Sequence, residues 1–205
     1  MGQEVVELWH KDTDLQGVDF VVLPGGFSYG DYLRSGAIAK FSPIMESVIA
    51  HANNGGYVMG ICNGFQILTE SGLLEGALLH NNNQKFICKN VHLKAVSKTA
   101  APTIDLDASK AYKIPIAHGE GRFHADEATI ASLQANDQIL FTYCDESGAQ
   151  TPEANPNGSL LHIAGITNKT KNVFGMMPHP ERAADKQLNN IDGLRIFESI
   201  LAHCK

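Results

Sequence analysis

The chain is poor in cysteine, and its cysteines form no paired motif. Only four of the 205 residues are cysteine, and none belongs to a C-x-x-C pair. Structural zinc sites and thioredoxin-type redox sites are built on such pairs, so we expect no metal site and no redox disulfide. Scattered free thiols are typical of a reducing compartment, and the cytoplasm is therefore the expected location.

Further absences in the sequence narrow the classes of function. No apolar run approaches the length of a membrane-spanning helix, and the first ten residues carry two glutamates where a signal peptide would have an apolar core. The formal net charge of -6 lacks the basic excess of a nucleic-acid binder. No Gly-Lys-Ser/Thr follows the glycine-rich stretch after residue 23, so we expect no phosphate loop for ATP. The chain also has no repeat or linker, which predicts one domain, residues 1–205, that binds neither membranes nor nucleic acid.

What is present is an alternation of apolar runs and amphipathic segments, typical of an α/β protein. Residues 18–23 are almost wholly apolar, as in a strand buried on both faces. A helix is expected to begin at Ser42 and Pro43 and to end at Gly55. The other expected strands are 5–9, 57–61, 87–96, 112–118, 138–143, 160–166 and 173–177, and a last helix should place Leu194, Phe197 and Leu201 on one face.

A cysteine stands between the strand at 57–61 and the helical pattern that follows it. Gly60, Cys62 and Gly64 form Gly-x-Cys-x-Gly, the cysteine analogue of the strand–turn–helix elbow that presents a serine nucleophile in other hydrolases. The glycines allow a sharp turn, through close backbone approach or a positive φ. Unpaired N–H groups at a helix N-terminus favour a thiolate. Cys62 is therefore expected to be a nucleophile rather than a buried structural cysteine.

A base for this nucleophile is expected far downstream, where the apolar run 173–177 leads into Pro178, His179, Pro180 and Glu181. Functional groups of α/β proteins gather at the carboxyl ends of strands. A histidine that takes the thiol proton, oriented by an acidic residue, completes an activated nucleophile. We therefore expect Cys62, His179 and Glu181 to act as a catalytic triad.

The two motifs together resemble those of the class I (triad) glutamine amidotransferases. That family carries Gly-x-Cys-x-Gly-x-Gln at the nucleophile and His-x-Glu as the remaining pair. This chain matches at Gly60, Cys62, Gly64 and Gln66, and again at His179 and Glu181. The resemblance implies a flavodoxin-like layered sheet, mostly parallel, with helices on both faces. It also implies hydrolysis of L-glutamine to glutamate and ammonia through a γ-glutamyl thioester.

Five more stretches resemble one branch of the family, the glutaminase subunits of phosphoribosylformylglycinamidine synthase. They are residues 23–34, 85–93, 115–123, 152–159 and 174–182. This resemblance implies a partner, an ATP-dependent synthetase subunit that uses the ammonia to convert formylglycinamide ribonucleotide to formylglycinamidine ribonucleotide in purine biosynthesis. A small third subunit is expected as well. ATP and Mg²⁺ would bind the synthetase, and this chain would need no cofactor of its own.

The family resemblance also implies roles outside the triad. The backbone N–H groups of Gly26 and Asn63 would form the oxyanion hole, and Gln66, Ser28, Asn81 and Phe86 would contact glutamine. Where the family usually has Ser-Gly between the last two, this chain has Asn83-Gln84. The segment 118–122 is expected to be a loop near the partner surface.

One departure from the family concerns the start of the chain. Family members ordinarily begin with one more βα unit, whose strand lies between the next two strands in the sheet. Here residues 11–17 alone join the first two expected strands, which is short for a parallel crossover. A fragment, a shortened chain or a rearranged sheet is therefore expected.

Two other functions stay open. One is a stand-alone cysteine hydrolase of the same topology, either a γ-glutamyl hydrolase or a DJ-1-type protein. The DJ-1 type normally has a histidine directly after the cysteine, where this chain has Asn63, and residues 27–31 and 152–159 disfavour the γ-glutamyl hydrolase. The other is a non-catalytic subunit, which the intact Cys62, His179 and Glu181 disfavour.

Overall fold

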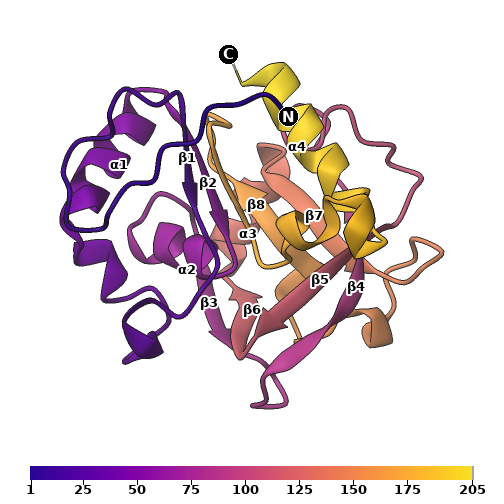
Figure 1. The fold of residues 1–205 in the computed structure, drawn as a ribbon. Coiled ribbons are helices and arrows are strands. Elements are labelled where there is room, and N and C mark those ends of the chain that lie inside the picture. Colours follow the sequence, from indigo (N-terminus) through magenta and orange to yellow (C-terminus); the bar gives the residue numbers. More distant parts are fainter. Residues whose placement is uncertain (205) are drawn as a thin grey trace.

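A seven-stranded sheet of order β1-β2-β9-β8-β7-β4-β5 lies at the centre of the computed structural model, which describes residues 1–204 (Figure 1). Parallel pairing joins β1 (Phe20–Leu23), β2 (Tyr57–Ile61) and β9 (Val173–Met176). The remaining neighbours pair antiparallel: β8 (Ile163–Thr167), β7 (Ile139–Cys144), β4 (Ile87–Ala95) and β5 (Tyr112–His118). A separate two-stranded sheet joins β3 (Ala77–His80) and β6 (Glu120–His124).

The parallel strands bring the two sequence motifs together. Ile61 of β2 is the register partner of Met176 of β9, so the two strands end at the same edge of the sheet. Cys62, the residue after β2, donates its backbone N–H to the Met176 carbonyl at 2.8 Å. This pairing places the cysteine motif beside the segment that leads to His179.

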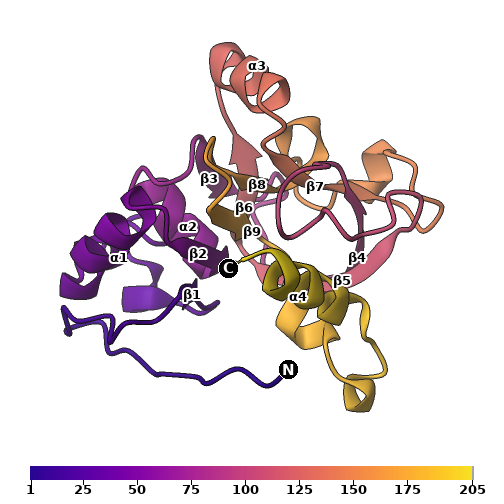
Figure 2. The same cartoon turned by 90° about the horizontal axis from the view of Figure 1, so that it is seen from above.

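The described residues form four α-helices: α1 (Pro43–Asn53), α2 (Asn63–Glu70), α3 (Glu127–Ala135) and α4 (Asp192–His203). Helices α1 and α2 pack on the β1–β2 part of the sheet, and α4 packs on β5 (Figures 1 and 2). The predicted start and end of α1 are confirmed, with Pro43 at its first position and Gly55 at a φ of +90° just after it. No helix in residues 1–204 is both long and apolar enough to cross a bilayer.

The prediction of a strand at residues 5–9 is wrong. This segment forms no regular element, and Val5 is 84% exposed. Figure 1 shows it as an extended thread outside the sheet. Strand β1 consequently pairs with β2 alone and lies at the sheet edge, where Val22 is 44% exposed. The expectation that residues 18–23 are buried on both faces is therefore wrong as well.

The predicted last helix is present, and its most deeply buried residues lie beside the face that carries Leu194, Phe197 and Leu201. Its buried apolar residues are Ile196 and Ile200, whereas Leu194, Phe197 and Leu201 are only half-buried. A Cβ on Gly193 would overlap the backbone of Pro180. This close approach to Pro180 accounts for glycine on the buried face of the helix.

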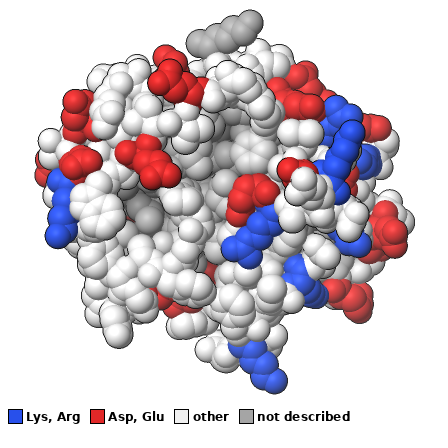
Figure 3. Space-filling view, viewed as in Figure 1, with Lys and Arg blue, Asp and Glu red and all other residues white. Residues whose placement is uncertain are grey.

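The segment 118–122 is also corrected by the structure. It is not a loop, since His118 ends β5 and Glu120 begins β6. The ring of His118 fills the space where a Cβ of Gly121 would stand, which explains the glycine. On the face of the molecule seen in Figure 3, the middle is hollowed and largely uncharged, and basic side chains gather toward β4 and β5.

Candidate active site

The predicted nucleophile elbow is present between β2 and α2. Cys62 has a φ of 51° and a ψ of -105°, a conformation that costs a non-glycine residue energy and that is found mainly at functional sites. The flanking residues must be glycine, because neighbouring backbone atoms lie where a Cβ would stand. A Cβ on Gly64 would overlap the Leu23 carbonyl, and one on Gly60 would lie 2.5 Å from the Gly64 backbone. The elbow is therefore held between β1 and α2 with the strain concentrated on the cysteine.

The thiol of Cys62 is buried, and its Sγ lies 3.7 Å from the Ala117 carbonyl, to which the S–H can donate. Burial raises the pKa of Cys62 to about 12, although the Asn63 backbone N–H and the charge of Arg182 act in the opposite direction. Desolvation thus outweighs the helix N-terminus. Burial therefore opposes the thiolate that the helix N-terminus favours.

Alkylation can measure this directly. We expect the reaction of Cys62 with iodoacetamide to accelerate by about tenfold per pH unit between about pH 7 and pH 10, because only the thiolate reacts. Peptide mass spectrometry follows Cys62, and the exposed Cys88 in the same protein reports on general reagent reactivity. A rate for Cys62 that is already constant near neutral pH would instead indicate a preformed thiolate.

His179 and Glu181 form the expected pair. The His179 Nδ1 donates to Glu181 Oε1 at 2.6 Å, which leaves the lone pair on Nε2. That Nε2 atom is buried and has no partner among residues 1–204. The backbone N–H of His179 donates to the Pro115 carbonyl at 2.8 Å and fixes the residue against β5. The imidazole is therefore oriented as a base with a free acceptor nitrogen.

One glycine separates the nucleophile from this base. A Cβ on Gly25 would lie 2.6 Å from His179 Cε1 and 3.5 Å from Cys62 Cβ. Cys62 and His179 are therefore neighbours across Gly25, although the thiol bonds to Ala117 rather than to the imidazole. Catalytic hydrogen bonds are often loose before substrate binds. The role of Gly25 was missed from the sequence, where Gly25-Gly26 indicated only a glycine-rich turn.

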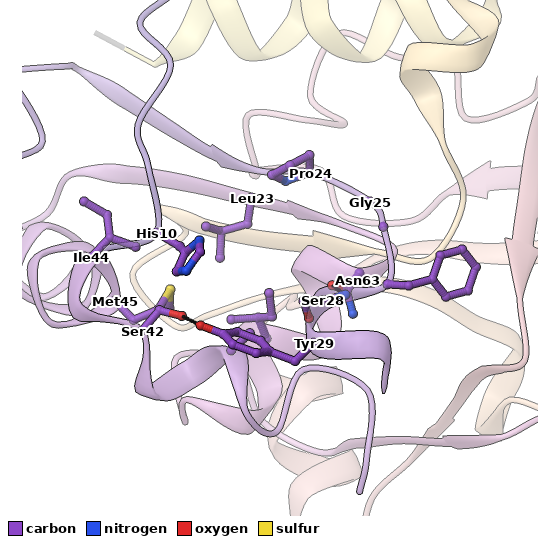
Figure 4. Close-up of a pocket in the computed structure, with 14 residues that line it drawn as sticks. His10, Leu23, Pro24, Gly25, Ser28, Tyr29, Ser42, Ile44, Met45 and Asn63 are labelled. Atoms are coloured by element: carbon purple, nitrogen blue, oxygen red, sulfur yellow. Dashed lines mark hydrogen bonds between the residues drawn. The ribbon is translucent and has the colours of Figure 1, made fainter. Parts of the chain in front are cut away.

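Gly26 and Asn63, the two expected oxyanion donors, are brought to one cavity of ≈ 480 Å³. Gly26 faces open space, and the Ser28 backbone N–H donates to Asn63 Oδ1 at 3.2 Å, which ties the glycine turn to the elbow. Figure 4 shows Gly25 and Asn63 toward one end of the cavity and Met45 toward the other. The glycine turn and Asn63 thus line this cavity, whereas Cys62, His179 and Glu181 are not among its lining residues.

Known proteins match both the sequence and this geometry. A family model described as a CobB/CobQ-like glutamine amidotransferase domain matches residues 3–199. The PurQ subunit of phosphoribosylformylglycinamidine synthase from Chlorobaculum parvum is 54% identical over 202 residues, which cover 98% of this chain and 80% of that protein. The PurQ subunit from Synechocystis is 58% identical, with 94% of this chain and 86% of that protein covered. The chain belongs to the glutamine amidotransferase family, in its PurQ branch.

A solved structure extends this match to three dimensions. The structure of PurLQS from Thermotoga maritima contains a chain that superposes with a TM-score of 0.81 at 42% identity. The alignment covers 95% of this amidotransferase and 84% of the Thermotoga chain. The expected family and the layered α/β fold are therefore confirmed.

Gln66 of this amidotransferase lies in a hydrogen-bond network beside the elbow. Its Oε1 accepts from Asn63 Nδ2 at 2.9 Å, and its Nε2 donates to the Glu120 carbonyl at 2.5 Å. Ser28, by contrast, has a buried hydroxyl with no partner in the described chain. Both residues were expected to contact glutamine. The Ser28 hydroxyl has no hydrogen-bond partner in the described chain, whereas the Gln66 side chain links α2 to β6.

Asn81 and Phe86 lie in different surroundings. Asn81 is fully buried, and its Nδ2 donates to the carbonyls of Lys85 and His118. Both of its side-chain N–H groups are thus used within the protein, and its contact with glutamine stays a prediction. Phe86 is 54% exposed and stacks on Phe27 with ring centroids 6.1 Å apart. It lies at the surface beside the glycine turn.

Proposed function

We propose that Cys62, His179 and Glu181 release ammonia from L-glutamine, and that this chain is the glutaminase subunit of a phosphoribosylformylglycinamidine synthase. The observation that carries the proposal is the strained, buried Cys62 across Gly25 from an imidazole whose Nδ1 is held by Glu181. The names and high identity of the PurQ relatives support the same function.

The reaction begins at the buried thiol of Cys62. As the Cys62 sulfur attacks the side-chain amide carbon of glutamine, His179 Nε2 takes the thiol proton. The N–H groups of Gly26 and Asn63 stabilise the oxyanion, and such donors contribute about 3–4 kcal/mol each. The protonated His179 gives its proton to the amide nitrogen, the C–N bond breaks and ammonia leaves.

The second half-reaction frees the enzyme. A γ-glutamyl thioester remains on Cys62, and His179 takes a proton from water as the water attacks the thioester carbon. The C–S bond breaks, glutamate leaves and the thiol regains its proton. Glu181 keeps the Nδ1–H tautomer throughout, so Nε2 is available in both steps.

The ammonia is consumed by a partner. We propose a synthetase subunit that carries ATP and Mg²⁺ and converts formylglycinamide ribonucleotide to formylglycinamidine ribonucleotide, together with a small third subunit. The likeness to a chain of the PurLQS structure supports such an assembly. The glycine-rich stretch of this chain has no Gly-Lys-Ser/Thr, which agrees with an ATP site on another subunit. The cytoplasmic location stays a prediction.

Glutamate release by the purified chain tests the proposal, measured alone and with the synthetase, ATP and formylglycinamide ribonucleotide. We expect little release by the chain alone and a strong increase in the loaded complex, because a coupled glutaminase should not waste glutamine. Equal release in both states would favour the stand-alone hydrolase. No release by a folded chain bound to its partner would favour the non-catalytic subunit.

A further inference from the structure

The side chain of Asn63 has no part in the mechanism above, which uses only its backbone N–H. Asn63 is 2% exposed and Gln66 is 5% exposed, so both carboxamides lie inside the protein. The Asn63 Oδ1 accepts from the Ser28 backbone N–H at 3.2 Å, and its Nδ2 donates to Gln66 Oε1 at 2.9 Å. The Gln66 Nε2 donates in turn to the Glu120 carbonyl. Successive hydrogen bonds therefore join the glycine turn to β6 through two side-chain amides.

The two ends of this series of hydrogen bonds fix its direction. A backbone N–H can only donate and a backbone carbonyl can only accept, so each amide between Ser28 and Glu120 has one orientation that satisfies both neighbours. If the Asn63 amide were turned over, its Nδ2 would face the Ser28 N–H and its Oδ1 would face Gln66 Oε1. The carboxamide of Asn63 is therefore a link with one fixed orientation.

Gly26 lies in a turn that is anchored at its two ends. At the start of the turn, Leu23 ends β1 and its carbonyl packs against Gly64. At the other end, the Ser28 N–H is bonded to Asn63. Between these anchors, no heavy atom of another segment lies within 4 Å of the position that a Cβ of Gly26 would take. The position of Gly26, the expected oxyanion donor, therefore depends on the anchors.

The backbone that follows Ser28 is strained. Tyr29 has a φ of 53° and Asp31 a φ of 54°, in the left-handed region that non-glycine residues rarely adopt. Such conformations persist only where the surrounding structure holds them. Here the Tyr29 hydroxyl contacts Ser42, and the Ser28 N–H contacts Asn63 (Figure 4). Loss of the contact with Asn63 should therefore let the turn relax.

We propose that the side chain of Asn63 positions the oxyanion hole, because it holds the Gly26 turn in place relative to the Asn63 backbone N–H. This inference rests on the proposed glutaminase function. Asn63 thus supplies one oxyanion donor from its backbone and fixes the other through its side chain. The oxyanion exists only after the thiol has attacked, so loss of this positioning should lower kcat and leave KM nearly unchanged.

Asn63→Leu in the complete complex tests this role, because leucine is similar in size and can make neither hydrogen bond. For glutamate release by the loaded complex we expect kcat to fall by about 10-fold to 100-fold, the loss for a group displaced by up to about 1 Å, with KM within about twofold of wild type. Asn172→Leu is the matched control. Asn172 is a buried asparagine whose Nδ2 donates to the carbonyls of Ala52 and Gly56, at the opposite end of β9 from Cys62. It should lower stability in denaturant unfolding and keep the wild-type kcat.

A second pair of variants reaches the same hydrogen bond from its donor. Ser28→Pro removes the backbone N–H together with the hydroxyl, whereas Ser28→Ala removes only the hydroxyl, so their difference measures the N–H. We expect kcat of Ser28→Pro to be below that of Ser28→Ala by a factor similar to the loss in Asn63→Leu. The double variant Asn63→Leu/Ser28→Pro should be no slower than the slower single variant, because both changes break one contact. This pair keeps the test valid if Asn63→Leu does not fold.

Several results would overturn the inference. One is a wild-type kcat in a folded Asn63→Leu complex, and another is a loss confined to KM, since the amide would then serve substrate binding. Additive losses in the double variant, or an equal loss of kcat in Asn172→Leu, would also count against it. If the wild-type complex releases no glutamate at all, the glutaminase function itself fails, and this inference with it.

Discussion

Replacing Cys62 by alanine should abolish glutamine-driven synthesis by the complex and leave ammonia-driven synthesis intact. Without the sulfur no thioester forms, and loss of a catalytic nucleophile typically lowers turnover by at least about 10⁴-fold. The synthetase does not use this residue, so ammonia added to the solution should still react. The measurement is the rate of formylglycinamidine ribonucleotide formation with each nitrogen source.

Two controls make this result specific. Cys88→Ala removes an exposed cysteine of β4 and should leave both reactions at wild-type rates. Size-exclusion chromatography checks that the Cys62→Ala chain still assembles with the synthetase. A correctly assembled complex that also loses ammonia-driven synthesis would contradict a role confined to glutamine hydrolysis.

The parts of the site that the sequence predicts are those with local causes. The elbow depends on glycine at positions 60 and 64, because a Cβ on Gly60 would overlap α2 and a Cβ on Gly64 would overlap β1. The His179–Glu181 pair lies within one turn of chain, and Pro180 between them restricts its shape. Helix α1 is predicted for the same reason, since its proline and glycine act on adjacent residues.

The missed features depend on contacts between distant segments. Cys62 is buried beside Ala117 of β5, and burial raises the pKa of its thiol, but no motif near residue 62 reports that burial. The internal roles of Gln66 and Asn81 come from bonds to Glu120 and His118. Similarly, β1 is apolar enough for a central strand, but pairing leaves it at the edge. The composition of a segment predicts which elements it can form, whereas its burial, hydrogen bonds and strand pairing depend on segments that are distant in the sequence.

Gly25→Ala should reduce glutaminase turnover by about 10²-fold, the loss expected when a catalytic group moves by about 1 Å. The new methyl would lie 2.6 Å from His179 Cε1, too close for a real contact. The imidazole cannot simply swing away, because its Nδ1 is bonded to Glu181 and its backbone N–H to Pro115. It should therefore shift relative to Cys62, on the other side of the same glycine.

The matched control is Gly119→Ala, where the nearest atom to a new Cβ is in the Phe86 ring at 4.0 Å. This variant adds the same methyl in open space at the end of β5 and should keep glutamate release within about twofold of wild type. Glutamate release by the loaded complex compares the two, and denaturant unfolding shows whether either has lost its fold. Wild-type turnover in a folded Gly25→Ala complex would mean that proton transfer to His179 does not depend on this contact, and that the base reaches Cys62 by another arrangement.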